Sequence, residues 1–296
     1  MRYGVSFPNF GDGVSARSLA DLAAEAEAVG WDGFFLWDHL FAFMPGPVPA
    51  VDPWIALAAI ALKTERVQIG PMVTPLPRRR PVKLARETAT LDHLSGGRLV
   101  LGVGIGAAPF EWDYLAEETD AKIRGAMLDE GLEVLTGLWR GEPFRHRGPH
   151  YRVAGDGGDA EWGAVCFPPP VQRPRIPIWV AGTWPRKPPF RRAARWDGVF
   201  PIKNDGQMTP DDVREMVGYV AAHRGTERDP NAPFEVVIGG ASDAGAAGTR
   251  TVAPLAEAGA TWWVEGIDPW RFGYADGAPW PVEAMHGRIR KGPPRG

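Results

Sequence analysis

The chain of 296 residues is 44% hydrophobic and 23% charged, so it can bury the core of one large α/β barrel or of two ordinary domains. Its formal net charge of -3 argues against nucleic acid or an anionic membrane surface as the main partner. The single cysteine, Cys166, excludes an intrachain disulfide, and no apolar run reaches the roughly 20 residues that span a bilayer. The sequence opens on a strand-like segment rather than a charged and then apolar leader, which favours a cytoplasmic protein.

Short apolar runs with the length of buried strands recur along the whole chain. They lie at residues 2–7, 33–37, 67–73, 99–104, 176–181, 198–202, 234–239 and 261–265. Most of them are continuously apolar rather than alternating, as in parallel strands that are buried on both faces. The sequence therefore predicts eight parallel strands.

Between these runs, apolar residues recur at spacings of three and four, which predicts amphipathic helices. The clearest patterns lie at residues 19–26, 84–94, 128–139 and 213–220. Gly30 suits the end of the first helix, and Thr209 can cap a helix that begins at Pro210, with Asp211 and Asp212 near the positive end of its dipole. The alternation of eight β/α units favours a (β/α)8 TIM barrel, as one domain over residues 1–296, rather than two open sheets.

Three segments exceed what a minimal barrel needs, at residues 41–52, 107–121 and 141–175. The first two follow strand ends, so we expect them to shape the substrate pocket, because loops after the strands form the functional face of such barrels. The third precedes the fifth strand. We expect it either to fold partly outside the barrel or to form a disordered bridge.

The second strand runs directly into Asp38 and His39. Histidine exchanges a proton near neutral pH, and a neighbouring carboxylate can orient or tune it. The pair is therefore a candidate for proton transfer. An aspartate helix cap followed by a hydrogen-bonded loop histidine is the competing interpretation.

The third strand ends in Met72, Val73 and Thr74, just before a proline-rich turn. This pattern predicts a bulged loop whose backbone and Thr74 hydroxyl can face a planar ring, although such turns often only terminate a strand. Three consecutive arginines follow at residues 78–80. Contact with an acidic cofactor tail is one interpretation, and a solvated basic patch is the one we favour for most of them.

Small residues follow two further strands, at Ile105 and Gly106 and at Gly182 and Thr183. Turns of this kind let backbone amides approach a flat ring or a phosphate group. Lys203, after the sixth strand, can add a positive charge. The glycine spacing lacks the full dinucleotide fingerprint and a lysine-bearing P-loop, so neither nicotinamide nor ATP binding is indicated.

Taken in order, these motifs resemble the luciferase-like monooxygenase family. The resemblance extends over nearly the whole chain and is carried by Tyr3-Gly4-Val5-Ser6-Phe7, Asp38-His39, Arg80, Leu84, Ala85, Arg86, Leu91, Asp92, Leu94, Ser95, Gly97, Arg98, Gly102, Gly104, Gly106, Leu135, Leu138, Trp139, Gly141, Tyr151, and the segments 178–182 and 192–198. It implies a barrel that binds FMN or the deazaflavin F420 across its C-terminal face.

Within that family the sequence resembles the F420-dependent branch more closely. The resemblance assigns the active-site pair to Asp38 and His39, the bulge behind the ring to Met72, Val73 and Thr74, the ring-side turn to Ile105 and Gly106, the phosphate turn to Gly182 and Thr183, and, more loosely, a cation to Lys203. One position departs from the branch, because Ala107 stands where some members have a glutamate acid. A sugar-phosphate dehydrogenase is therefore in doubt, and Glu111 is a speculative replacement.

The resemblance implies hydride transfer between F420 and a small organic substrate, with His39 moving a proton and Asp38 orienting His39. Aromatic residues at or near the insertions are candidates to enclose the substrate, with ordinary packing as the alternative for each of them: Trp37, Phe41, Phe43, Trp54, Phe110 and Trp112. An oxygen-using FMN monooxygenase that receives reduced flavin from a partner flavin reductase is the main alternative. A non-catalytic flavin-binding protein is a third.

The six histidines include no close pair at strand ends, so we expect no metal site. We also expect a homodimer with no nucleic-acid or membrane partner.

Overall fold

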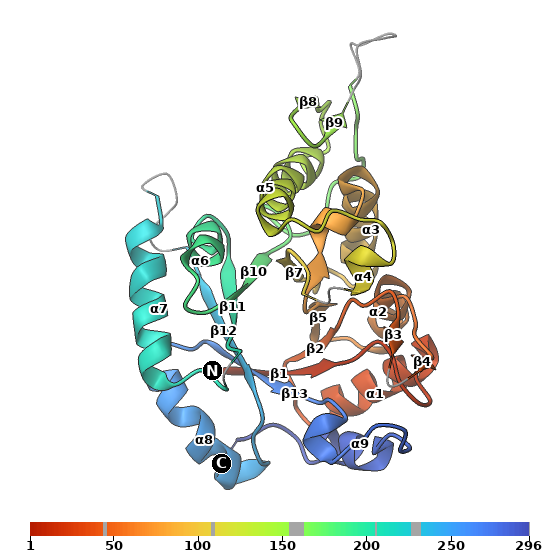
Figure 1. The fold of residues 1–296 in the computed structure, drawn as a ribbon, viewed down its shortest axis with the longest axis vertical. Helices are drawn as coiled ribbons and strands as arrows, with labels where there is room; N and C mark the ends of the chain where they lie inside the picture. The colour runs from red at the N-terminus through yellow and green to blue at the C-terminus, as the bar shows by residue number, and fades with distance from the viewer. Residues whose placement is uncertain (44–45, 108–109, 154–162, 205, 226–231, 296) are drawn as a thin grey trace.

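The computed structural model describes residues 1–43, 46–107, 110–153, 163–204, 206–225 and 232–295. Its parallel strands form a ring at the centre of the molecule (Figure 1). The barrel strands are β1 (Arg2–Phe7), β2 (Gly33–Leu36), β5 (Gln68–Pro71), β7 (Leu101–Gly104), β10 (Ile178–Thr183), β11 (Gly198–Ile202), β12 (Glu235–Gly240) and β13 (Trp262–Gly266). All eight predicted strands are thereby confirmed.

The strands are hydrogen-bonded in the order β5-β2-β1-β13-β12-β11-β10-β7. A parallel bridge between Ile69 and Leu99 brings β5 against the segment that leads into β7, and this bridge closes the ring. After β5 the chain passes through a cis Met72–Val73 peptide and pairs again with β7 as the short β6 (Thr74–Pro75). The expected (β/α)8 barrel is the fold of the protein.

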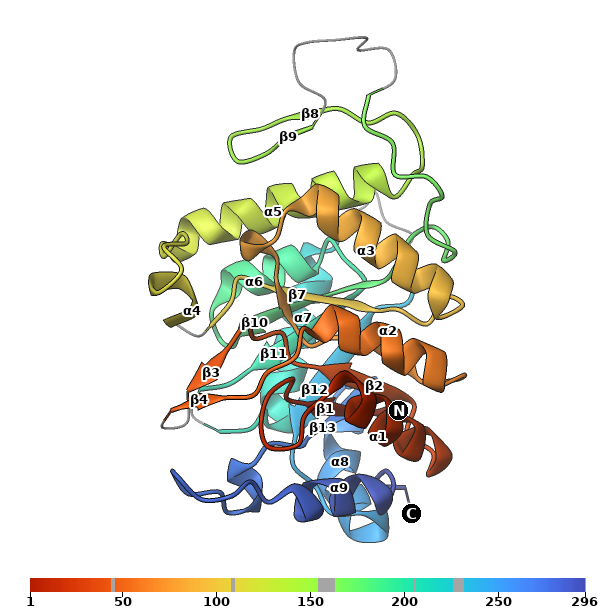
Figure 2. The ribbon, with the colours of Figure 1, turned by 90° about the vertical axis from the view of Figure 1, so that its right-hand side faces the viewer.

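Helices surround the ring (Figures 1 and 2). They are α1 (Ala16–Ala28), α2 (Pro53–Lys63), α3 (Pro81–Leu94), α4 (Phe110–Asp113), α5 (Ala121–Leu138), α6 (Lys187–Ala193), α7 (Pro210–His223), α8 (Gly245–Glu257) and α9 (Val282–Arg290), with short 3₁₀ turns η1 (Leu76–Arg78) and η2 (Trp270–Phe272). The Thr209 hydroxyl accepts from the Asp212 N–H, as expected for a cap. Gly30 follows α1 with φ of 92°, a left-handed conformation that favours glycine.

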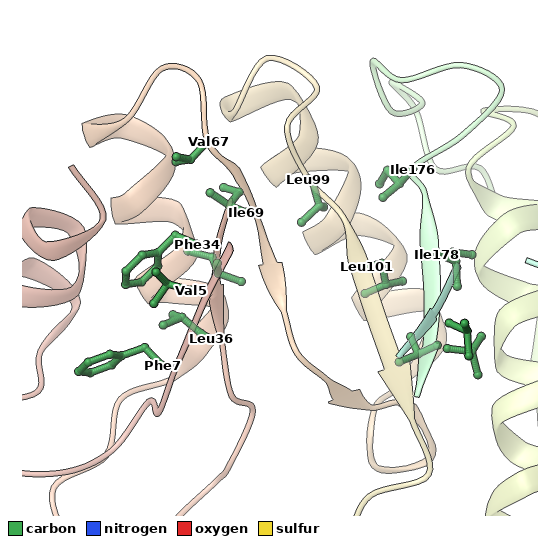
Figure 3. Packing of buried hydrophobic residues seen from close by; sticks show 14 of the residues in the cluster. Val5, Phe7, Phe34, Leu36, Val67, Ile69, Leu99, Leu101, Ile176 and Ile178 are labelled. Atoms are coloured by element: carbon green, nitrogen blue, oxygen red, sulfur yellow. The ribbon is translucent and has the colours of Figure 1, made fainter. Parts of the chain in front are cut away.

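The strands are buried on both faces, which explains their continuous apolar runs. Residues such as Val5, Phe34 and Ile69 belong to the large cluster between the ring and the helices (Figure 3). Inside the ring, the rings of Phe35, Trp179 and Trp262 pack against one another, with centroids 5.4–5.9 Å apart. We call these three residues the aromatic plug.

Glycines on the neighbouring strands make room for the plug. A Cβ at Gly4 would lie 2.8 Å from the Phe35 ring, and one at Gly198 would lie 2.6 Å from the Trp179 ring. Large rings therefore fill the inside of the barrel only because the facing positions have no side chain.

The three insertions take different forms. Residues 41–52 contain the two-stranded hairpin β3 (Ala42–Phe43) and β4 (Pro47–Val48), and residues 107–121 contain α4. Residues 141–175 contain the hairpin β8 (His146–Arg147) and β9 (Arg152–Val153), which lies beyond α5 as seen from the strands (Figure 2). The described part of the third insertion thus folds partly outside the barrel, which is one of the two alternatives, and residues 154–162 lie outside the described residues.

Candidate active site

The C-terminal ends of the parallel strands meet at one rim, because every barrel strand runs in the same direction. A cavity of about 450 Å³ lies at this rim, within the range of about 300–1,000 Å³ that is typical of small-molecule and cofactor sites. It is lined by Ser6, Trp37, Met72, Phe200, Pro201, Ile202, Lys203, Gly206, Gln207, Met208, Gly239, Gly240, Ala241, Val264, Gly266, Asp268 and Arg271. Of the site residues expected from the sequence, Trp37, Met72 and Lys203 line it.

Asp38 follows β2 and lies in a buried charge cluster rather than in the open cavity. Its Oδ2 accepts a hydrogen bond of 2.7 Å from the Thr74 hydroxyl, and its Oδ1 accepts one of 2.5 Å from Arg79 Nη2. Arg78 Nη2 donates to the Asp38 backbone carbonyl at 3.1 Å. Asp38 therefore joins the bulge after β5 to the start of the loop after β2.

The interpretation of residues 78–80 as a solvated patch is wrong for two of the three arginines. The side chains of Arg78 and Arg79 are only 3% and 17% exposed and pair with carboxylates of the site, whereas Arg80 is exposed. A buried guanidinium requires such partners, since an unpaired buried charge is costly. The spacing of the arginines alone gives no sign of which one turns inward.

His39 lies beside a different carboxylate from the one expected. Its Nδ1 donates to Glu111 Oε2 at 3.2 Å, while Glu111 Oε1 accepts a hydrogen bond of 2.6 Å from the Leu40 N–H. The expectation that Asp38 orients His39 is therefore corrected, because the side chain of Asp38 bonds Thr74 and Arg79 and the carboxylate at the imidazole belongs to Glu111. Ala107 lies at the exposed start of the same insertion.

Burial raises the pKa of Glu111, but hydrogen bonding and charge attraction from His39, the charge of Arg78 and the Leu40 N–H together lower it to about 2. Glu111 is thus ionised near neutral pH and can only accept hydrogen bonds. The proton in its contact with His39 is carried by Nδ1, so Nε2 of the neutral imidazole can accept a proton.

The backbone of His39 is fixed by Asn9, a fully buried residue that follows β1. Asn9 Oδ1 accepts from the His39 N–H at 3.1 Å, and Nδ2 donates to the carbonyl oxygens of His39 and Val51 at 2.8 Å each. This asparagine was not among the expected site residues. Its only sequence signal is a polar side chain two residues after the end of the first strand.

The aromatic surroundings of His39 include one expected residue, Trp37, and one that was not expected, Phe10, while the side chain of Phe43 lies outside the described part of the structure. The rings of Phe10 and Trp37 lie 5.4 Å and 5.9 Å from the imidazole, and Trp37 also lines the cavity. Phe41 and Phe110 pack against each other at 5.7 Å.

Two of the three expected tryptophans, Trp54 and Trp112, are buried by packing. Trp54 is buried in the hydrophobic core at the start of α2. Trp112 is 2% exposed and packs beneath Gly106, where an added Cβ would lie 2.2 Å from its ring. Its ring also stacks against Arg124, whose Nη1 donates to the Ile105 carbonyl at 3.1 Å. Trp54 and Trp112 are therefore packing residues in this structure.

The remaining expected cofactor residues lie on the rim with partners of their own. Ile105 and Gly106 form the turn that follows β7, and Val73 packs near Gly102 and Gly104. An added Cβ on Gly182 would lie 2.1 Å from Pro189, so this glycine is required by packing in the protein itself.

Thr183 ends β10 and is partly exposed. Lys203 Nζ donates to Asp212 Oδ2 at 2.8 Å, and burial, which alone would raise the pKa of Asp212, is outweighed by Lys203 and Thr209, so that this pKa falls to about 2.

In the part of the chain that the structure describes, no group of three or more His, Cys, Asp or Glu side chains is arranged to hold a metal ion. Among the same residues, no helix is both long and apolar enough to cross a membrane.

The sequence profile of the luciferase-like monooxygenase family matches residues 1–248. The chain belongs to this family. Family membership and fold are therefore as expected from the order of the motifs.

Two curated relatives illustrate the range of the family. The F420-dependent glucose-6-phosphate dehydrogenase of Microbacterium testaceum (strain StLB037) is 36% identical over 172 residues, which cover 57% of this chain and 48% of that protein. The oxygenase component of flavin-dependent trigonelline monooxygenase from Acinetobacter baylyi (strain ATCC 33305 / BD413 / ADP1) is 33% identical over 170 residues, covering 57% of this chain and 44% of the relative. The chain spans about half the length of the curated relatives it matches.

Among solved structures, an F420-dependent secondary alcohol dehydrogenase in complex with an F420-acetone adduct superposes with a TM-score of 0.73. The superposition covers 90% of this chain and 92% of the other at 18% identity. At that identity the likeness shows the shared barrel fold.

Proposed function

We propose that this protein is an F420-dependent oxidoreductase that transfers a hydride to or from a small organic substrate. The observation that carries the proposal is His39, held by the ionised Glu111 at the rim of a luciferase-like barrel. The F420-dependent relatives and the shared fold support it.

The cavity residues fit a flat ring. Gly239, Gly240 and Gly266 expose backbone to the cavity, which allows a planar ring to approach closely, and Met72 lines the cavity beside them. Lys203 and Arg271 lie on the same lining, where Lys203 pairs with Asp212 and Arg271 with Glu265, and Asp268 adds a carboxylate. We therefore propose that these residues, with the turns at Ile105–Gly106 and Gly182–Thr183, hold the cofactor.

F420, when bound, supplies a ring carbon that gives or takes a hydride. In the oxidative direction His39 Nε2 accepts the proton that leaves the substrate hydroxyl, and the resulting imidazolium lies beside the Glu111 carboxylate. In the reductive direction the imidazolium returns that proton to the substrate oxygen. The rings of Phe10 and Trp37 pack against the imidazole, and Asn9 keeps the His39 backbone in place.

The proposal is tested by titrating the apoprotein separately with F420 and FMN and then measuring turnover with and without oxygen. We expect tight binding of F420 and reduction or oxidation of a small alcohol or carbonyl compound without oxygen uptake. Tight binding of FMN with oxygen consumed in step with substrate would replace the proposal.

The second candidate is an FMN monooxygenase, which the similarity to the trigonelline enzyme's oxygenase component favours. It would depend on a flavin reductase partner, whereas the F420 enzyme would not. Addition of an NADH-dependent flavin reductase therefore separates the two. A cytoplasmic homodimer stays a prediction for either function.

A further inference from the structure

Arg78 and Arg79 form a buried charge cluster with Asp38 and Glu111 at the rim. Arg78 is the more buried of the two arginines, and it contacts both acidic residues. Nη1 lies 2.9 Å from Glu111 Oε2, Nη2 donates to the Asp38 carbonyl at 3.1 Å, and Nη2 lies 3.8 Å from Asp38 Oδ1. The Trp112 ring lies 5.7 Å from its guanidinium carbon. One planar side chain thus joins the loops that follow β2 and β7.

Glu111 Oε2 is shared between Arg78 and the imidazole. The same oxygen is 2.9 Å from Arg78 Nη1 and 3.2 Å from His39 Nδ1. Its other oxygen is occupied by the Leu40 N–H at 2.6 Å. The carboxylate therefore cannot rotate away from His39 without giving up the Arg78 contact or the Leu40 contact.

The groups around His39 come from several elements. Glu111 of α4 faces Nδ1, Arg78 of η1 lies behind Glu111, and Asp38 precedes His39 in the chain, while Arg79 neutralises Asp38. The rings of Phe10 and Trp37 and the amide of Asn9 are uncharged. Two arginines against two carboxylates balance when His39 is neutral, and protonation of the imidazole adds one positive charge to a largely buried cluster.

We propose that Arg78 is a positioning residue for His39 that acts through Glu111. Its charge, placed against the carboxylate oxygen that accepts from Nδ1, limits how readily the imidazole gains a proton. Glu111, held on its other oxygen by the Leu40 N–H, keeps a hydrogen on Nδ1 and leaves Nε2 as the proton acceptor. The inference rests on the proposed function in that His39 moves the substrate proton. The geometry that carries it does not depend on which flavin binds.

The test is the NMR titration of the His39 imidazole in the isotopically labelled apoprotein, for the wild type and four variants. Arg78→Met removes a positive charge while keeping an apolar stem, so the midpoint should move to higher pH by about one pH unit. Glu111→Gln removes the negative charge, so the midpoint should move to lower pH, by roughly one to three pH units. Damage to the fold alone does not predict shifts of opposite sign.

Two further variants are the controls. Arg78→Lys keeps the charge and loses the planar fork, so its midpoint should stay near the wild-type value. Arg124→Met removes a half-buried arginine that stacks on the same Trp112 ring but donates to the Ile105 carbonyl, and it should leave the His39 titration unchanged. If Arg78→Met fails to fold, Arg78→Gln takes its place, because it also removes the positive charge, and the same shift to higher pH is expected.

In the F420-loaded enzyme, the pH at which kcat/KM falls on the acid side should shift in the same direction as the His39 midpoint of each variant. For Arg78→Lys this pH should equal the wild-type value. An Arg78→Met midpoint that equals the wild-type value would overturn the positioning role. So would an Arg78→Met midpoint that moves to lower pH, as the midpoint of Glu111→Gln is expected to do. The expected titrations without F420 turnover in the wild type would instead contradict the proposed function and leave the positioning role standing.

Discussion

The inside of the barrel and its C-terminal rim show two ways in which one sequence fixes side chains. Inside, Phe35, Trp179 and Trp262 pack ring against ring, and glycines on adjacent strands complement them. At the rim, Asp38, His39 and Glu111 are held by charges and hydrogen bonds from other loops. Packing from neighbouring strands fixes the plug, whereas the rim depends on contacts between residues up to 72 positions apart, as for His39 and Glu111.

The contrast predicts that plug variants change stability without changing the chemistry at the rim. Phe35→Ala removes a fully buried ring and should lower the free energy of unfolding by about 3–5 kcal/mol. Urea unfolding measures the loss, and the pH dependence of activity of the folded fraction should match the wild type. A shifted pH profile would show that the two regions are coupled.

Rim carboxylates should instead make stability depend on pH. The folded-state pKa of Glu111 is lowered to about 2, so its ionisation stabilises the fold above its unfolded pKa near 4.5, and that stabilisation is lost as pH falls through about 2. It amounts to something on the order of 3 kcal/mol. The difference in unfolding free energy between wild type and Glu111→Gln should shrink between pH 5 and pH 2. A difference that is constant over this range contradicts the assignment.

Gly182 separates a packing requirement from a ligand requirement. An added Cβ would lie 2.1 Å from Pro189 Cβ, so Gly182→Ala should cost about 1–3 kcal/mol of stability with no cofactor present. Thermal unfolding of the apoprotein checks this. If Gly182→Ala leaves the stability of the apoprotein unchanged but weakens F420 binding, the glycine serves only the phosphate turn and the packing requirement is wrong.

Arg80 should give the smallest effect. It is exposed and adjacent in sequence to the buried Arg78 and Arg79, so Arg80→Gln should change stability by no more than about 0.5 kcal/mol and leave the His39 titration unchanged. The same two measurements used for Arg78 apply. A shift comparable to that of Arg78→Met would mean that local charge, rather than the buried contact, controls the imidazole.

Much of the fold was predictable because strand burial and helix amphipathicity follow from the spacing of apolar residues within short stretches of the sequence. The eight strands, the Thr209 cap and the Gly30 helix end all follow from residues within a few positions of one another. The strand ends also indicated which residues would lie at the rim, including Met72 and Lys203 at the cavity.

The partners within the rim could not be predicted, because they depend on how separate loops meet. Nothing local distinguishes Arg78 from Arg80, or shows that Glu111 rather than Asp38 reaches His39. Trp112 was expected near the substrate because aromatic insertions often line pockets, yet it is used to support the Gly106 turn. Asn9 was missed since an asparagine after a strand is ordinary in sequence.

The most direct measurement is steady-state turnover and F420 affinity of His39→Ala beside the wild type. A general acid–base group contributes roughly 10²- to 10⁴-fold, so kcat should fall by that factor. The dissociation constant for F420 should change only slightly, because His39 is held by protein contacts and does not line the cavity. Wild-type turnover in His39→Ala, or a loss confined to F420 affinity, would contradict the account.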